Sequence, residues 1–276
     1  MRSKSFEINN SHAAILVDAS QICKWTYNLA MANVKPDVRI FENLDSLRQA
    51  AAELFVETSA QAIVQRGRFL VTLSGGNTPT ELYKLLAQSP FKEQIDWPRV
   101  RVFWGDERCV AIEDLESNYR QARDVLLSHV PIPAENIHRV ESSLEPAEAA
   151  KDYALVLKQF ASPPLDWPRF DLALLGLGED GHTASLFPGS EVNVSSPTLA
   201  VTARYQSRPA NRVTLTPLVF NGARRIIFLV SGESKAQTLA NVLYGGYHPE
   251  QLPAQRIHPT DGELIWMVDK LAASKL

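Results

Sequence analysis

Cysteine is scarce in this sequence, since only Cys23 and Cys109 occur among its 276 residues. The two lie far apart and lack the paired spacing of a zinc site, which argues against a disulfide framework and a structural metal centre. So little cysteine is typical of a reducing compartment. We expect a cytoplasmic protein that binds no metal.

Long hydrophobic runs are missing as well. No run approaches the ~20 residues that a membrane-spanning helix requires. The N-terminal run AAILV (13–17) is too short for the core of a signal peptide, and Asp18 follows it directly. We therefore expect no membrane segment.

Neither sign of charge predominates, because 28 Lys and Arg stand against 31 Asp and Glu, a formal net charge of −3. The basic residues form no cluster larger than pairs such as Arg224–Arg225, so the electrostatic footprint of a nucleic-acid-binding protein is missing. A small molecule is the expected partner. The composition does not predict the oligomeric state.

Regular patterning is lacking in residues 1–36. Met31 opens the stretch MANVKPDVRIFEN like a fresh start, and Glu7 and Asp18 do not suit an acid-poor transit peptide. We interpret residues 1–36 as an N-terminal extension that is dispensable, and residues 37–276 as a single domain.

From residue 37 onward, apolar runs of strand type alternate with helical patterns. The runs are DVRIF (37–41), RFLVTL (68–73), RVRVFW (99–104), FDLALLG (170–176), LAVTA (199–203) and RRIIFLV (224–230). Between them lie amphipathic segments such as 44–65. One face of that segment carries Leu47, Ala51, Leu54, Phe55 and Thr58. The alternation predicts an α/β fold, a mostly parallel, Rossmann-like open sheet with helices on both faces.

Clusters of glycine and charge follow four of these runs. They are SGGNTPTEL (74–82), GDER (105–108), GLGEDGH (176–182) and SGESK (231–235). Ligands of open α/β sheets bind beyond the carboxyl ends of the strands. We therefore expect the site at this edge.

The first cluster predicts a phosphate site. Gly75 and Gly76 allow a turn that approaches a ligand closely, and Thr78, Pro79 and Glu81 suit the N-cap, N1 and N3 positions of a helix. Free N–H groups at such a helix start bind anions. Because the lysine of a P-loop is missing, a simpler phosphate ester is favoured over a nucleoside triphosphate. The alternative is a well-capped turn without a ligand.

Charged residues at the other strand ends have two interpretations each. Arg212 and Lys235 supply cations for the same phosphate, or they are solvated surface residues. In GDER, Asp106 and Glu107 can orient groups or take protons, and Arg108 can bind a carbonyl or phosphate oxygen. The alternative for GDER is a local ion pair on a solvated loop.

The GLGEDGH cluster has the G-x-G-x-x-G spacing of a dinucleotide site. Glu179 and Asp180 at the variable positions would repel a pyrophosphate, no acidic residue follows at the distance that a ribose requires, and Pro188 leaves little room for a helix. The cluster therefore favours a turn that presents a catalytic group. His182 is the candidate, because an imidazole titrates near neutrality and can serve as base or acid.

Together these motifs resemble those of the 6-phosphogluconolactonase family. The matching segments are LSGGNTP, VFWGDER with SNY (117–119), FDLALLGLGEDGHTASLFPG, RVTLTP, SGESK, LPAQ and GELIWMVD, from about residue 37 to 272. The resemblance implies hydrolysis of 6-phospho-D-glucono-1,5-lactone to 6-phosphogluconate, the second step of the oxidative pentose phosphate pathway, without an obligatory cofactor or metal.

For this substrate we propose a mechanism that gives each candidate residue a role. The C6 phosphate lies on the backbone of 75–78 with Arg212 and Lys235. Asn77 stands where the family often has Ser or Arg, so its side-chain contribution stays open. His182 takes a proton from the attacking water and returns it to the ring oxygen.

The proposed mechanism includes two further roles. Either Asp180 or Asp106 holds the imidazolium of His182, and Arg108 stabilises the oxyanion.

Two rival functions remain. Glucosamine-6-phosphate deaminases share the fold and a related turn, but they typically continue with AFNEPG after one apolar residue, where this chain reads HTASLFPG. A non-catalytic sugar-phosphate-sensing domain would be expected beside a DNA-binding module. The first 37 residues show no helix-turn-helix pattern.

Overall fold

In residues 36–205 and 207–276, which the computed structural model describes, seven strands form the main sheet. In spatial order they are β1 (Asp37–Phe41), β10 (Glu263–Asp269), β9 (Arg225–Val230), β6 (Leu172–Leu175), β2 (Phe69–Leu73), β3 (Val100–Trp104) and β5 (Ile137–His138). All neighbouring strands of this sheet are parallel. The predicted extension, residues 1–36, lies outside the described residues apart from Pro36.

The chain reverses its direction across the sheet between β2 and β6. It runs outward from β2 through β3 to β5, returns to β6 beside β2, and continues outward through β9 and β10 on the other side. Loops that follow strands on the two sides of such a switch point diverge and leave a crevice at the carboxyl ends. The loops after β2 and β6 are therefore placed to form a site.

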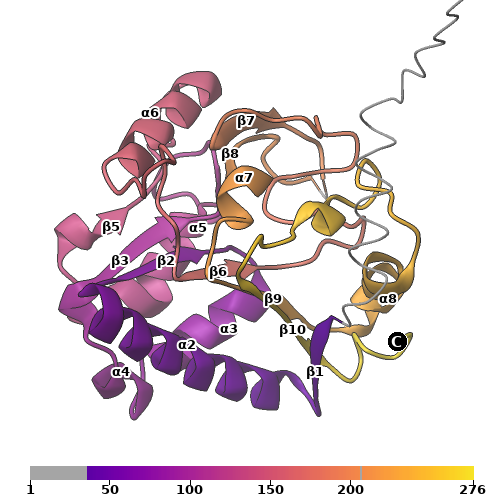
Figure 1. Cartoon of the computed structure of the whole chain (residues 1–276), viewed down its shortest axis with the longest axis horizontal. Coiled ribbons are helices and arrows are strands. Elements are labelled where there is room, and N and C mark those ends of the chain that lie inside the picture. Colours follow the sequence, from indigo (N-terminus) through magenta and orange to yellow (C-terminus); the bar gives the residue numbers. More distant parts are fainter. Residues whose placement is uncertain (1–35, 206) are drawn as a thin grey trace, which may run out of the picture. The chain divides into compact units, whose positions relative to one another are not determined.

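Alternate residues of each strand enter two separate cores, because successive side chains point to opposite faces. Val71 belongs to the core under α2 (Leu44–Arg66), α3 (Asn77–Leu86) and α4 (Phe91–Gln94). Leu70 belongs to the opposite core. That core packs against α6 (Pro146–Lys158), α7 (Pro217–Phe220) and α8 (Ala236–Tyr244). Figure 1 shows α2, α3 and α4 on one side of the strands and α6 and α7 on the other. The predicted α/β fold with helices on both faces is confirmed.

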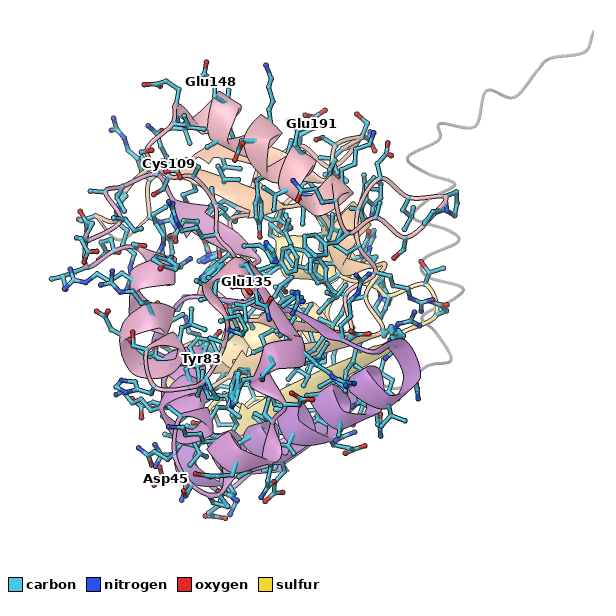
Figure 2. The ribbon with its side chains drawn as sticks, turned by 90° about the vertical axis from the view of Figure 1, so that its left-hand side faces the viewer. Asp45, Tyr83, Cys109, Glu135, Glu148 and Glu191 are labelled. Atoms are coloured by element: carbon cyan, nitrogen blue, oxygen red, sulfur yellow. The ribbon has the colours of Figure 1, made fainter. Side chains whose placement is uncertain are left out.

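Helix α2 illustrates how well periodicity predicts a long element. All five residues of the predicted apolar face are buried. The side chain of Asn43 accepts a hydrogen bond from the N–H of Ser46 at its start, and Gly67, with φ of 73°, ends it in the left-handed region. Figure 2 shows acidic residues such as Asp45, Glu148 and Glu191 at the periphery and Tyr83 inside.

A second, antiparallel sheet consists of β4 (Asp106–Arg108), β8 (Asn211–Leu215) and β7 (Thr198–Thr202). The placement of 199–203 in the parallel sheet was therefore wrong. Alternate residues of β7 are exposed, as expected for a strand at the edge of a sheet with one solvated face. The alternative of a solvated GDER loop is also wrong, because all of β4 is buried.

The remaining elements are short. They are α5 (Asn118–Ala122), a π-helical turn (Arg123–Leu127) and 3₁₀ turns at Trp97–Arg99, Ala134–Asn136, Glu233–Lys235 and Pro253–Arg256. No helix among the described residues is long and apolar enough to span a membrane.

Candidate active site

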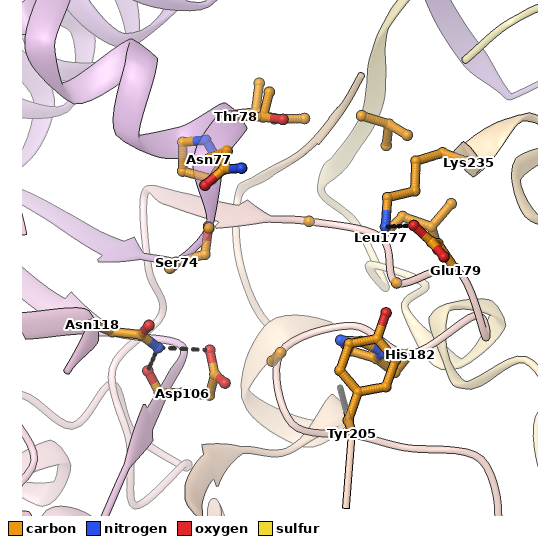
Figure 3. A pocket seen from close by; sticks show the side chains of 18 of the residues that line it. Ser74, Asn77, Thr78, Asp106, Asn118, Leu177, Glu179, His182, Tyr205 and Lys235 are labelled. Carbon is orange, nitrogen blue, oxygen red and sulfur yellow. Dashed lines mark hydrogen bonds and ion pairs between the residues drawn. The ribbon is translucent and has the colours of Figure 1, made fainter. Parts of the chain in front are cut away.

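A cavity of about 410 Å³ opens at the carboxyl edge of the parallel sheet. Its walls are the loops after β2, β6 and β9 together with the β4–β8 pair (Figure 3). Nine of the ten predicted site residues line it, namely Gly75, Gly76, Asn77, Thr78, Asp106, Arg108, His182, Arg212 and Lys235. The tenth, Asp180, contacts the ring of His182. Segments more than 100 residues apart in sequence therefore meet as predicted.

Both glycines after β2 are required by the geometry. A Cβ on Gly75 would lie 1.9 Å from Oδ1 of Asn118, and Gly76 has φ of 107°, which other residues rarely adopt. The Tyr83 hydroxyl donates to the carbonyl of Ser74 at 2.8 Å and accepts from its N–H at 2.9 Å. The loop is thus held from beneath by its own helix.

The predicted cap of α3 was wrong. The helix begins at Asn77 with Gly76 as its N-cap, and no side chain in the described part of the chain caps it. The Thr78 hydroxyl instead forms a 2.8 Å hydrogen bond with the hydroxyl of Ser231, on the loop after β9. Glu81 binds Arg48 and Lys84. Because the flexible glycine pair lets the helix start two residues earlier than predicted, its first N–H groups stay available to an anion in the cavity.

Residues 176–182 form a tight turn. The N–H of Gly178 donates to the carbonyl of His182 at 2.8 Å, and Gly181 has φ of 85°. No helix follows within residues 183–197, so the backbone lacks the helix start on which a dinucleotide pyrophosphate rests. The dinucleotide alternative is therefore excluded, and the turn presents the side chain of His182.

His182 and Asp180 form a close pair on this turn. Nδ1 of His182 lies 2.5 Å from Oδ1 of Asp180, so in the neutral ring Nδ1 carries the proton and Nε2 is free to accept one. Burial opposes ionisation of Asp180, but its hydrogen bonds to His182 outweigh that effect and lower its pKa. The imidazole packs against Phe187 and Tyr205, with ring centroids 4.5 and 4.7 Å away.

Asp106 has other partners. Its Oδ2 accepts a hydrogen bond from the Ser185 hydroxyl at 2.6 Å, and its carbonyl accepts one from the amide of Asn118 at 2.8 Å. Of the two carboxylates proposed for His182, Asp180 is therefore the one in contact. Asp106 belongs to the wall opposite the turn (Figure 3).

The same wall of the cavity contains two buried arginines. Arg108 and Arg212 are directly opposite each other on β4 and β8, and only 6% and 3% of their surfaces are exposed. Like charges in this arrangement repel each other. Among the described residues, Nε of Arg108 and one terminal nitrogen of Arg212 have no hydrogen-bond partner. Burial lowers the pKa of Arg212. Guanidinium nitrogens without partners in this position suit the oxygen atoms of a phosphate or of a carbonyl group that becomes charged.

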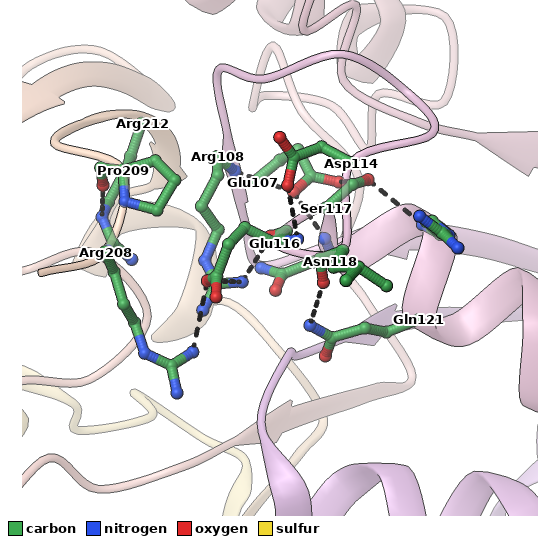
Figure 4. A network of polar contacts seen from close by, with 12 residues as sticks. Glu107, Arg108, Asp114, Glu116, Ser117, Asn118, Gln121, Arg208, Pro209 and Arg212 are labelled. Carbon is green, nitrogen blue, oxygen red and sulfur yellow. Dashed lines mark hydrogen bonds and ion pairs between the residues drawn. The ribbon is translucent and has the colours of Figure 1, made fainter. Parts of the chain in front are cut away.

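A third arginine lies beside this pair. Arg208 contacts Glu116 at 3.5 Å, and the same carboxylate oxygen lies 3.6 Å from Arg108 (Figure 4). The Arg212 guanidinium also stacks over Phe187, 5.3 Å from the ring centroid. Phe187 thus contacts both the Arg212 guanidinium and the His182 ring.

Lys235 approaches from the other side. It ends the 3₁₀ turn after β9, and its Nζ lies 3.8 Å from a carboxylate oxygen of Glu179. Burial lowers the pKa of Lys235, although the charges of Glu179 and Asp180 oppose that effect. An amine poised between a carboxylate and the open cavity can bind a phosphate group.

Several cavity residues were not predicted. They include Asn118, Glu179, Tyr205, Arg208 and Ser231. Asn118 was present only as part of the segment SNY, directly after the good N-cap residue Ser117. Tyr205 and Arg208 lie on a loop with no pattern, and nothing local in the sequence distinguishes them from surface residues.

Comparisons with known proteins place this geometry in context. Residues 42–266 match the family model described as "Glucosamine-6-phosphate isomerases/6-phosphogluconolactonase". A 6-phosphogluconolactonase of Synechocystis sp. is 38% identical over 243 residues, which cover 87% of this chain and 98% of the relative.

Two solved structures are similar in fold to this chain. The 6-phosphogluconolactonase of Trypanosoma brucei is 30% identical, with a TM-score of 0.76 over 88% of this chain and 99% of that one. A monomeric glucosamine-6-phosphate deaminase has a TM-score of 0.75 over 87% of this chain and 100% of that one. Because its identity is only 22%, it shares the fold alone.

Proposed function

The chain belongs to the glucosamine-6-phosphate isomerase/6-phosphogluconolactonase family, and we propose that its site hydrolyses 6-phospho-D-glucono-1,5-lactone to 6-phospho-D-gluconate. The observation that carries this proposal is the His182–Asp180 pair, which faces a cavity supplied with cations and free helix N–H groups. The reaction is the second step of the oxidative pentose phosphate pathway. Residues 37–276 are proposed as its catalytic domain, in the cytoplasm.

The phosphate is proposed to bind at the start of α3. The backbone of residues 75–78 offers N–H groups. Thr78 is hydrogen-bonded to Ser231 on the segment after β9, and Lys235 lies on the same segment. Arg212 adds a terminal guanidinium nitrogen that has no hydrogen-bond partner in the described part of the chain. An anion there gains charge-assisted hydrogen bonds from both cations and from the helix start. The ester group would thereby orient the sugar ring across the cavity.

His182 acts as the general base. With Nδ1 bonded to Asp180, Nε2 accepts a proton from water as the water oxygen attacks C1 of the lactone. The bond between C1 and the ring oxygen then breaks, and the imidazolium returns its proton to that oxygen. The ionised Asp180 stabilises the imidazolium between these two steps. The product is an acid, and it releases one proton to solvent at neutral pH.

Arg108 is proposed to stabilise the oxyanion. Charge develops on the carbonyl oxygen of the lactone as water adds, and a preorganised donor at that position lowers the barrier. The Arg108 guanidinium is buried and donates to the Glu116 carbonyl, and its Nε has no hydrogen-bond partner among the residues that the structure describes. Such a group needs little reorganisation when the charge forms.

The test offers both candidate substrates to one preparation. Freshly generated 6-phosphogluconolactone is followed by acid release and glucosamine 6-phosphate by ammonia release. We expect acid release well above the spontaneous rate and no ammonia. Ammonia without catalysed acid release would establish the deaminase alternative. The absence of both products would favour a sugar-phosphate-sensing domain.

A further inference from the structure

Glu107 lies in the middle of β4, between two residues that line the cavity. Asp106 and Arg108 line it, whereas Glu107 does not. Neighbouring residues of a strand point to opposite faces, so Glu107 points away from the substrate. Its side chain is nevertheless buried, with only 2% of the residue exposed. A buried carboxylate behind a binding wall needs an explanation, since burial of a charge without partners is costly.

Four donors converge on this carboxylate. Oε1 accepts hydrogen bonds from the N–H groups of Asn118 and Arg108, both at 2.7 Å. Oε2 accepts one from the N–H of Tyr119 at 2.7 Å and one from the Ser117 hydroxyl at 3.3 Å. The donors from 117–119 are the first residues of α5 and the residue before it. The carboxylate therefore fastens the start of α5 to β4 (Figure 4).

Residues 116–118 set the positions of two groups that line the cavity, the Arg108 guanidinium and the Asn118 amide. The carbonyl of Glu116, the residue before Ser117, accepts a 2.5 Å hydrogen bond from the Arg108 guanidinium. The side-chain amide of Asn118 donates to the carbonyl of Asp106, and its Oδ1 packs against Gly75 on the loop after β2. A shift of this segment would move both groups.

We propose that Glu107 is a positioning residue, whose carboxylate sets the places of the Arg108 guanidinium and the Asn118 amide by holding residues 117–119 against β4. The inference rests on the proposed function, in which Arg108 stabilises the oxyanion. Glu107 touches no substrate and acts through these two residues.

An amide cannot replace the carboxylate. Oε1 and Oε2 each face at least one backbone N–H at 2.7 Å, so either orientation of a glutamine would direct its NH₂ group at a donor. Burial raises the pKa of Glu107 to about 7, while the hydrogen bonds from Tyr119, Asn118 and Arg108 act in the opposite direction. Measurements therefore belong at pH 8, where the wild-type carboxylate is ionised.

The first experiment compares Glu107→Gln with the wild type in lactone hydrolysis. Displacement of a catalytic group by about 1 Å costs on the order of 10²-fold, so we expect kcat to fall ~10–100-fold with KM changed less than about threefold. Asp171→Asn is the matched control. Asp171 is a buried carboxylate at the opposite edge of the sheet that binds the Leu70 N–H and Arg66. The Asp171→Asn variant should lose thermal stability but keep the wild-type kcat.

A double-mutant cycle with Arg108→Met separates positioning from a general effect on the fold. If Glu107 acts through Arg108, Glu107→Gln should reduce kcat by less than about threefold in the Arg108→Met background, because coupled residues are not additive. Equal losses in both backgrounds would overturn the inference, as would wild-type kcat in Glu107→Gln.

A milder variant covers the case in which Glu107→Gln does not fold. Ser117→Ala removes one donor to Oε2, and we expect a roughly threefold lower kcat that disappears in the Arg108→Met background. Wild-type kcat in Ser117→Ala would then count against the inference. Acid release by the wild type in the same series distinguishes failure of this inference from failure of the proposed function.

Discussion

Gly178 lies so close to His182 that a Cβ at this position would fall 2.0 Å from Nδ1 of the imidazole and 2.6 Å from Oδ1 of Asp180. The space between the turn and the His182–Asp180 pair therefore admits only a glycine. In Gly178→Ala the ring must move, and a misplaced base costs on the order of 10²-fold in kcat. The measurement is kcat for acid release, with the thermal midpoint of the same preparation.

Gly105→Ala is the matched control. Its Cβ would meet the carbonyl of Leu73 and the ring of Phe220 at 3.5 Å, which is ordinary van der Waals contact. We expect kcat within about threefold of the wild type. If both alanine variants had equal activity, close packing of Gly178 against the pair would not matter for the reaction.

The phosphate proposal predicts a difference between two substrates. Lys235→Met and Arg212→Met each remove a charge-assisted hydrogen bond, worth roughly 1.5–3 kcal/mol or about 10–150-fold in binding. Each should weaken binding of the phosphorylated lactone and scarcely alter slow turnover of unphosphorylated gluconolactone. A fall in kcat can accompany the rise in KM, because remote binding energy also positions C1.

The two lactones are each other's control in that experiment. Equal losses on both would mean that the cations act at the carbonyl or on the fold. The phosphate would then bind elsewhere.

His138 predicts a pH dependence of stability away from the site. Burial, and then the charge of Arg101, lower its pKa from 6.5 to about 4, and the ring stacks on Phe103 with centroids 4.6 Å apart. The unfolded chain binds a proton near pH 6.5 and the folded protein only near pH 4. Unfolding therefore takes up a proton between these values, and stability falls as the pH drops through this window.

His138→Phe should keep the aromatic stacking and remove this proton uptake. We expect the fall in thermal midpoint between pH 7 and pH 5 to shrink by roughly 2–4 °C, a modest effect because the ring is only half buried. His129→Gln, at an exposed histidine, is the control. An unchanged fall in His138→Phe would contradict the prediction.

Local patterns predicted much of this fold. The 3.6-residue periodicity of 44–65 identified α2, and the apolar runs identified β1, β2, β3, β6 and β9 to within two residues at each end. The same logic missed β10 and placed β7 in the wrong sheet. Pairing partners decide which sheet a strand joins, and a run of five residues says little about them.

The site was predictable where its residues follow strands directly. His182 and the glycines after β2 combine a turn with a strand end, so their place in the cavity followed from topology. The cap of α3 was not predictable. The Thr78 hydroxyl can bond either to its own helix or to Ser231, and Ser231 is 153 residues away in the sequence. Tyr205 and Arg208 reach the cavity through tertiary packing that no local pattern records.

The most direct test of the central claim is the rate of acid release from freshly generated 6-phosphogluconolactone, measured for the wild type and His182→Ala. The account predicts that the wild type far exceeds the spontaneous rate and that the variant loses ~10²–10⁴-fold in kcat with little change in KM, because its base is gone. The variant should keep a wild-type thermal midpoint to within a few degrees. Near-normal kcat in His182→Ala, or a wild type no faster than the background, would contradict the account.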